Sequence, residues 1–108
     1  MAGSRQPRRF RGLTRALVLG RVLPVAERPG ARLAGLSLLR REQAGPGLLI
    51  PRCSSVHTFG MRFALDLVFL DAGGRPLRRV GGVGAGRVVS CRGAAAVLEV
   101  PAGRVGSD

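Results

Sequence analysis

The sequence predicts a mainly β protein, a small single-domain β-sandwich or barrel of roughly five to six short strands with one amphipathic helix. Its 108 residues are enough for one domain and too few for two ordinary ones. The 17 glycines and 7 prolines are typical of short strands joined by tight turns rather than of a helical bundle. In addition, short apolar runs separated by turn residues fill the second half of the chain.

The first half of the chain is predicted to hold a basic arm, a strand and a helix. Residues 1–14 contain several arginines and no acidic residue, and we expect a flexible arm there, followed by a β-rich domain over residues 15–108. Residues 16–26 predict a strand that Pro24 places near a sheet edge. Residues 31–43 predict one amphipathic helix of about three turns, ended by a Gly-Pro-Gly turn. Its apolar positions are Leu33, Leu36 and Leu39.

The second half is predicted to form a series of strands. Residues 63–71 are apolar on both alternating faces, so we expect a central strand that is covered on both sides. An Asp-Ala-Gly-Gly turn then leads to a hairpin partner at residues 75–80. Residues 81–86 are interpreted as a surface loop, because no helix follows these glycines to hold a phosphate. The remaining predicted strands are residues 48–50, 87–91 and 95–100.

The chain is strongly basic, with a formal net charge of +12, and all 18 of its basic residues are Arg. Because these arginines are spread along the chain and Lys is absent, GC-rich coding bias explains them better than specific nucleic-acid binding does, and only non-specific polyanion binding is expected. The lack of Trp and Tyr argues against stacking platforms for single-stranded nucleic acids. No apolar run is long enough for a membrane span and no convincing signal peptide is found, so we expect a cytoplasmic protein with reduced cysteines.

Several motifs resemble one known family. Arg32 with Gly35 and Leu36 resembles its Arg-x-x-Gly-Leu helix, and four further segments resemble the uncharacterised prokaryotic family catalogued as domain of unknown function number 192. These segments are GLLIPRC at residues 47–53, SVHTFGMR at 55–62, LDLVFLD at 65–71 and AVLEVPAG at 96–103. The likeness covers roughly residues 17–105. It implies a mainly β, sandwich-like fold, and it implies no activity because the family has none established.

The chain departs from the family's pattern at two places. The family often carries a Trp-Met pair where this chain has His57 and Thr58, so the chain resembles a branch with a Cys-x-x-x-His variant. Family members usually continue beyond the Ala-Gly turn into a last strand. Because this chain stops at Asp108, we expect that strand to be missing and an unpaired sheet edge to remain.

Cys53 and His57 form the first candidate site. A thiolate beside an imidazole that Asp66 orients is the arrangement that a nucleophilic cysteine requires. The alternative is that Cys53 is a small buried apolar residue and His57 a hydrogen-bonded loop residue. Cys53, His57 and Cys91 could also hold a zinc ion, and Cys53 could pair with Cys91 in a disulfide, but neither arrangement has a specific motif and no metal or other cofactor is expected.

Two carboxylates on apolar strands form the second candidate site. Asp66 and Glu99 each need donors if they are buried, because an unpaired buried carboxylate is costly. If they converge with Arg52 or Arg62, they outline a pocket for a polar ligand. Our first hypothesis is therefore a non-enzymatic binding or accessory module for an anionic or polar small ligand or a protein partner. The alternatives are a Cys/His-dependent enzyme or metal site, and weak nucleic-acid binding through the arginine-rich surface.

Overall fold

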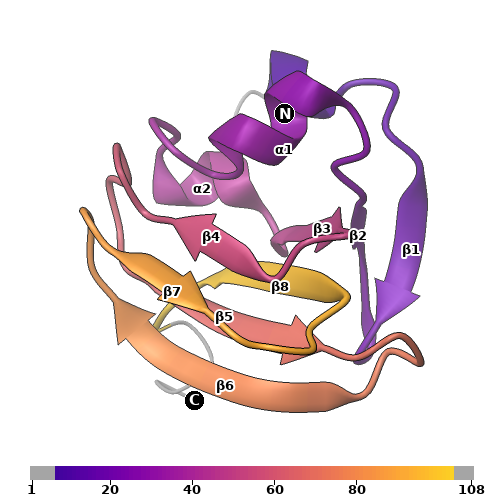
Figure 1. Cartoon of the computed structure of the whole chain (residues 1–108). Coiled ribbons are helices and arrows are strands. Elements are labelled where there is room, and N and C mark those ends of the chain that lie inside the picture. The colour runs from indigo at the N-terminus through magenta and orange to yellow at the C-terminus, as the bar shows by residue number, and fades with distance from the viewer. Residues whose placement is uncertain (1–6, 104–108) are drawn as a thin grey trace.

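The computed structural model describes residues 7–103, and these residues form a mainly β fold, as the sequence predicts (Figure 1). Eight short strands make three sheets, and in this part of the chain they do not close into a barrel. The strands are β1 (Arg15–Val18), β2 (Arg21–Pro24), β3 (Leu48–Pro51), β4 (Ser55–His57), β5 (Leu65–Leu70), β6 (Pro76–Val83), β7 (Val88–Ser90) and β8 (Ala96–Pro101).

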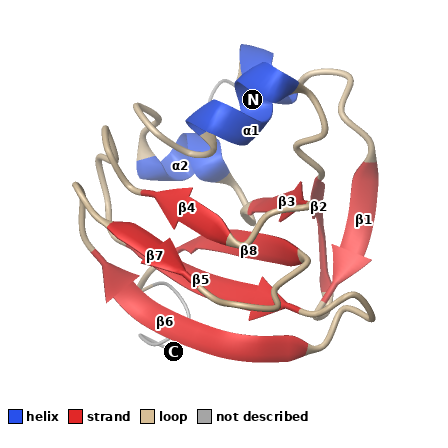
Figure 2. Ribbon diagram, viewed as in Figure 1, coloured by secondary structure: helices blue, strands red, loops and turns tan. Residues whose placement is uncertain are grey.

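The helical segments are short and gather on one side of the molecule (Figure 2). They are α1 (Pro29–Ala34), α2 (Arg41–Ala44) and a 3-10 helix (Arg8–Phe10). Phe10 belongs to the predicted N-terminal arm, yet its ring is buried in the core. Residues 1–6 of that arm, and residues 104–108, to which the expectation about a last strand applies, lie outside the described residues. None of the helices within residues 7–103 is long and apolar enough to cross a membrane.

The main sheet has four strands in the order β3-β8-β5-β6, and every neighbouring pair is antiparallel. Strand β5 lies inside this sheet, as its apolar sequence predicts, because it pairs with β6 on one side and with β8 on the other. The other two sheets are the β1-β2 hairpin and the β4-β7 pair. In Figure 1, α1 and α2 lie above β3, β4 and β8, whereas β6 lies at the opposite end of the molecule.

The main sheet buries apolar side chains on both faces. On the face toward the helices, Leu65, Leu67 and Phe69 of β5 join the larger core. On the other face, Val68 and Leu70 of the same strand pack in a smaller cluster that the β1-β2 hairpin helps to cover. The alternation of side chains along β5 therefore separates two cores, and the face on which a residue lies determines which environment it meets.

The single helix predicted over residues 31–43 is wrong. The helix α1 ends at Ala34, and α2 begins only at Arg41. Gly35 adopts a φ of 54° and Leu38 a φ of 65°, left-handed conformations that a continuous α-helix does not contain. Leu33, a residue that the amphipathic pattern places on the buried face, is 73% exposed.

Three further segments differ from the predicted elements. Residues 16–26 form no single strand, because Leu19 and Gly20 both adopt positive φ and turn the chain into the β1-β2 hairpin. Residues 55–57 form the strand β4, which pairs with β7. The glycine-rich segment 81–86 is a loop only in part, because β6 continues to Val83 and pairs there with Leu65.

Candidate functional site

Glu99 lies in the middle of β8, on the face of the sheet that carries the larger core. The register places it opposite Leu67 of β5 and opposite Leu48 of β3, two residues that are fully buried in that core. Its side chain is 3% exposed, although it is ionisable. Because β8 is hydrogen-bonded on both sides, the backbone fixes the position of this carboxyl group.

A pocket of about 370 Å³ lies between α1, β3, β4 and β8, and Glu99 is part of its lining. The apolar part of the lining comes from Leu36, Ile50, Val56 and Met61. The remaining lining residues are Pro29, Arg32, Leu33, Ala34, Gly35, Cys53, Ser55 and His57. Thus a buried carboxyl group and a largely apolar wall share one cavity, which is the usual composition of a small-molecule site.

The carboxyl group of Glu99 is only partly satisfied by the protein. Its Oε1 atom is buried and has no hydrogen-bond partner among the described residues. Burial raises the pKa of Glu99 from its ordinary value of 4.5 to about 7, and a hydrogen bond from the Leu36 backbone partly offsets this rise. Both the protonated and the ionised forms are therefore present near neutral pH.

Gly35 allows the turn after α1 to approach this carboxyl group. A Cβ atom at residue 35 would lie 2.7 Å from Oε1 of Glu99, closer than van der Waals contact permits. The positive φ of Gly35 also favours glycine. This turn brings the Leu36 backbone to Glu99, so one glycine both ends the helix and forms part of the site.

Both ring nitrogens of His57 are hydrogen-bonded to the backbone, and one of these bonds connects β4 to α1. Its Nε2–H donates to the Leu33 carbonyl at 2.9 Å, and its Nδ1 accepts from the Phe59 backbone N–H at 3.1 Å. The His57 and Phe59 rings are also stacked, with centroids 5.5 Å apart. Both ring nitrogens of His57 are thus engaged with the backbone of the pocket wall.

Arg32 and Cys53 also direct their polar groups to the backbone. The Arg32 guanidinium donates to the Pro51 carbonyl and, at 3.0 Å, to the Arg52 carbonyl. The Cys53 thiol donates to the Ser55 carbonyl at 3.1 Å. No hydrogen bond joins Cys53 to His57 within residues 7–103, because each group is instead bonded to the backbone.

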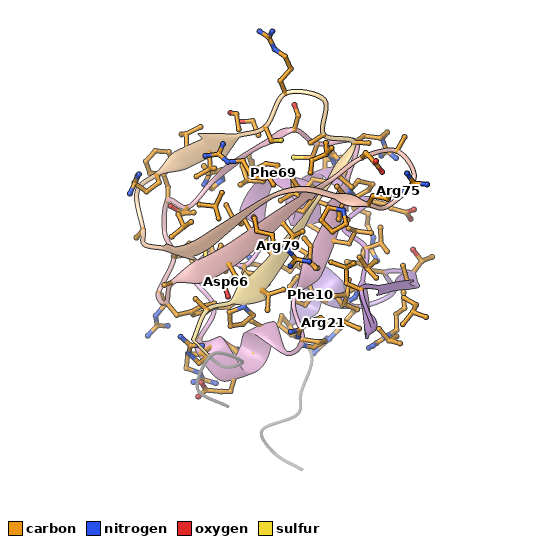
Figure 3. All side chains as sticks on the ribbon, turned by 90° about the horizontal axis from the view of Figure 1, so that it is seen from below. Phe10, Arg21, Asp66, Phe69, Arg75 and Arg79 are labelled. Atoms are coloured by element: carbon orange, nitrogen blue, oxygen red, sulfur yellow. The ribbon has the colours of Figure 1, made fainter. Side chains whose placement is uncertain are left out.

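Asp66 is separate from this site, contrary to our expectation. It is the register partner of Val100, whereas Glu99 is the partner of Leu67, so Asp66 and Glu99 point to opposite faces of the sheet. Asp66 is half-buried, and its Oδ1 accepts from the Gly82 backbone N–H at 2.9 Å. Figure 3, seen from below, labels Asp66, which lines a different pocket together with Arg21 of β2 and Arg79 of β6.

The other predicted site residues also stay outside the pocket of Glu99. The side chains of Arg52 and Arg62 are exposed and do not line it. Cys53 and Cys91 are both free thiols, and the described residues contain no group of three or more His, Cys, Asp or Glu side chains placed to hold a metal ion. Of the predicted site residues, the structure thus brings together Cys53, His57 and Glu99. The sequence pattern did not identify Arg32 or Gly35 as pocket residues.

Comparisons with solved structures agree with this architecture. A crystal structure of a candidate transcription regulator from Sinorhizobium meliloti 1021 is 23% identical, with a TM-score of 0.69 over 86% of this chain and 81% of the other. A protein of unknown function from Novosphingobium aromaticivorans DSM 12444 is 16% identical, with a TM-score of 0.63 over 96% of this chain and 92% of the other. At these identities the likeness is one of fold.

A search of curated proteins found no match. Residues 18–107, by contrast, match the family DUF192, described as uncharacterized ACR. This match spans most of the chain, and it confirms the resemblance that the sequence motifs indicate. The chain belongs to the DUF192 family.

Proposed function

We propose that this protein is a non-enzymatic binding module whose pocket takes a small polar ligand through a hydrogen bond to Glu99. The observation that carries the proposal is the buried Oε1 of Glu99, which has no partner within residues 7–103. A buried polar atom without a partner destabilises the fold by about 1–3 kcal/mol. A ligand that donates a hydrogen bond to this atom recovers that free energy on binding.

The other polar groups of the pocket support this assignment. The Arg32 guanidinium, the His57 ring and the Cys53 thiol already hydrogen-bond to the backbone, and the Ser55 hydroxyl accepts from the Ser90 hydroxyl. The polar recognition of a ligand therefore depends mainly on Glu99, while the apolar wall packs against the rest of the ligand. The same engagement of Cys53 and His57 favours a binding module over a Cys/His-dependent enzyme.

The surroundings of the pocket complete the proposal. Exposed arginines such as Arg52 and Arg62 contribute to the positive charge of the surface, and we expect them to give weak, salt-sensitive association with polyanions outside the site. The free thiols of Cys53 and Cys91 support a reducing compartment, and hence the cytoplasmic location expected from the sequence.

A fragment titration followed by two-dimensional amide NMR tests the proposal. A set of small cationic, neutral and anionic fragments is added to the wild-type protein, to Glu99→Leu and to Asp66→Asn. We expect fragments to shift the amide signals of Gly35, Leu36 and Val56. Glu99→Leu removes the acceptor atom and should abolish these shifts. Asp66→Asn, a matched change at the carboxyl group on the opposite face, should leave them unchanged.

Blocking the pocket chemically provides a second test that does not depend on the folding of Glu99→Leu. In a Cys91→Ser background, alkylation of Cys53 with N-ethylmaleimide places a bulky group at a residue of the pocket lining. The alkylated protein should lose fragment binding. The proposal is overturned if fragments bind equally well to the alkylated protein, or if the wild-type protein responds to fragments only around Asp66.

A further inference from the structure

We infer that the ligand is an organic cation, a protonated primary amine with a compact apolar body, which pairs its ammonium group with the ionised carboxylate of Glu99. This inference rests on the proposed function and specifies its ligand class. It follows from the donors and acceptors of the pocket, from the charged groups around Glu99, and from the apolar wall.

Several donors that line the pocket already have a backbone acceptor, whereas one acceptor atom of Glu99 lacks a donor among residues 7–103. Both terminal nitrogens of Arg32 donate to backbone carbonyls, the Nε2–H of His57 donates to another, and the Cys53 thiol donates to a fourth. The unsatisfied atom is an acceptor, Oε1 of Glu99. An ammonium group brings up to three N–H donors to that atom.

The charge of the ligand decides which form of Glu99 it selects. An anion beside Glu99 would require the carboxyl group to stay protonated, because two like charges in a buried pocket repel each other strongly. A cation selects the ionised form and compensates for the burial that raises the pKa of Glu99. A charge-assisted hydrogen bond is also roughly twice as strong as one between neutral groups, so an ammonium gains more than a hydroxyl does.

Several arginines belong to the elements that pack around Glu99, and each directs its guanidinium to the backbone. Arg32 of α1 donates to the Pro51 and Arg52 carbonyls, and Arg9 of the 3-10 helix donates to the Gly35 carbonyl. On α2, Arg41 donates to the Ala102 carbonyl.

The titratable groups of the opposite wall are Cys53 and His57, which are hydrogen-bonded to the backbone. None of these arginines or titratable groups forms an ion pair with Glu99 within residues 7–103, so the carboxylate is left for a ligand.

The apolar wall of the pocket determines which organic group is attached to the ammonium nitrogen of the ligand. Leu36, Ile50, Val56 and Met61 present hydrocarbon to the cavity of about 370 Å³. A short alkyl or cycloalkyl chain packs against these residues without leaving a polar atom unsatisfied. Binding then has a simple proton balance. The protonated carboxyl group releases one proton to solvent, and the ammonium cation keeps its own protons and pairs with the carboxylate.

Three probes of equal chain length test the inference, namely n-butylammonium, n-butanol and butyrate. Each is titrated into the wild-type protein, Glu99→Gln and the control Asp66→Asn between pH 5.5 and 8.5, and binding is measured from the amide shifts of Gly35 and Leu36. Because a pKa of about 7 makes the ionised form about 25 times more abundant at pH 7.5 than at pH 5.5, the affinity for n-butylammonium should rise about 25-fold between these two pH values. The affinity for n-butanol should change little.

The substitution Glu99→Gln keeps an acceptor oxygen and removes the charge. It should abolish the preference for n-butylammonium over n-butanol, whereas Asp66→Asn should retain it. Calorimetry in two buffers of different ionisation enthalpy should show that a proton is released when n-butylammonium binds the wild-type protein at pH 6.5.

The outcomes separate this inference from the proposed function. If n-butanol binds at the pocket as tightly as n-butylammonium at every pH, the cation inference is overturned and the donor-binding pocket stands. Tightest binding of butyrate with proton uptake would also overturn it, because Glu99 would then act as the donor. If none of the probes shifts the signals of Gly35 and Leu36, and the fragment set does not shift them either, the cation inference and the proposed binding function are both overturned.

Discussion

The substitution Glu99→Gln tests the physical basis of the site through the pH dependence of folding. Glu99 binds its proton more tightly in the folded protein, where its pKa is about 7, than in the unfolded chain, where it is near the ordinary 4.5. Between these values the folded state holds more protons, so the stability of the wild-type protein falls as the pH rises. The contribution is fully retained below about pH 4.5 and is lost as the pH rises through about 7.

The size of this effect follows from the two pKa values. At 1.36 kcal/mol for each pKa unit, the difference between 4.5 and about 7 corresponds to about 3 kcal/mol. A Gln side chain has nearly the same shape and does not titrate. The free energy of unfolding of Glu99→Gln relative to the wild type should therefore increase by about 3 kcal/mol between pH 4.5 and pH 8.5.

Urea unfolding followed by far-ultraviolet circular dichroism measures this difference, since the chain has no Trp or Tyr for fluorescence. The other carboxylates titrate equally in both proteins, so their contributions cancel in the difference. The control Asp66→Asn removes a half-buried carboxyl group on the opposite face of the same sheet. A Glu99→Gln difference that is constant with pH, or that grows toward acid, would refute the reasoning.

Three further predictions concern the walls of the pocket. Gly35→Ala should reduce the free energy of unfolding by about 1–3 kcal/mol in urea titrations, because the new Cβ atom meets Glu99 and the φ of residue 35 is positive. An unchanged stability would show that the turn is not held against the carboxyl group. His57→Leu should cost about 0.5–1.5 kcal/mol by the same assay, since two solvent-accessible backbone groups exchange a protein partner for water. Cys53 should react with iodoacetamide no faster than free cysteine, because its thiol donates to a backbone carbonyl and has no hydrogen bond to His57. Alkylation rates measured by mass spectrometry check this, and a rate far above that of free cysteine would restore the nucleophile hypothesis.

The elements that the sequence predicts correctly are those whose pattern has one interpretation. Residues 65–70 are apolar at nearly every position, and a strand buried on both faces is the simplest arrangement for such a run. The leucine spacing in residues 31–43 is less specific. Leu36 and Leu39 are buried although the helix ends before them, because the turns after α1 direct both side chains into the core. Gly35 was visible as an unfavourable residue within that helix, and it is in fact the residue that ends it.

The candidate site was predicted only in part for a related reason. The sequence indicates that Asp66 and Glu99 are carboxylates on apolar strands, but it does not indicate whether the two side chains lie on the same face of the sheet. That depends on the register between β5 and β8, two strands separated by a long stretch of chain. A shift of one residue in this pairing would have placed Asp66 opposite Glu99, where the structure has Val100. The position of Arg32 beside Cys53 likewise depends on tertiary packing.

The doubly paired strand β8 also determines which side of the cavity can adjust to a ligand. Strand β8 carries Glu99 in the cavity lining. Moving β8 would break its backbone hydrogen bonds to both β3 and β5, a rearrangement close to global unfolding. On the other side of the cavity, α1 has only six residues and is followed at once by a tight turn. The amides of α1 should therefore exchange with solvent much faster than those of β8. The helix α1 can therefore adjust to a ligand locally, while Glu99 stays in place on the sheet.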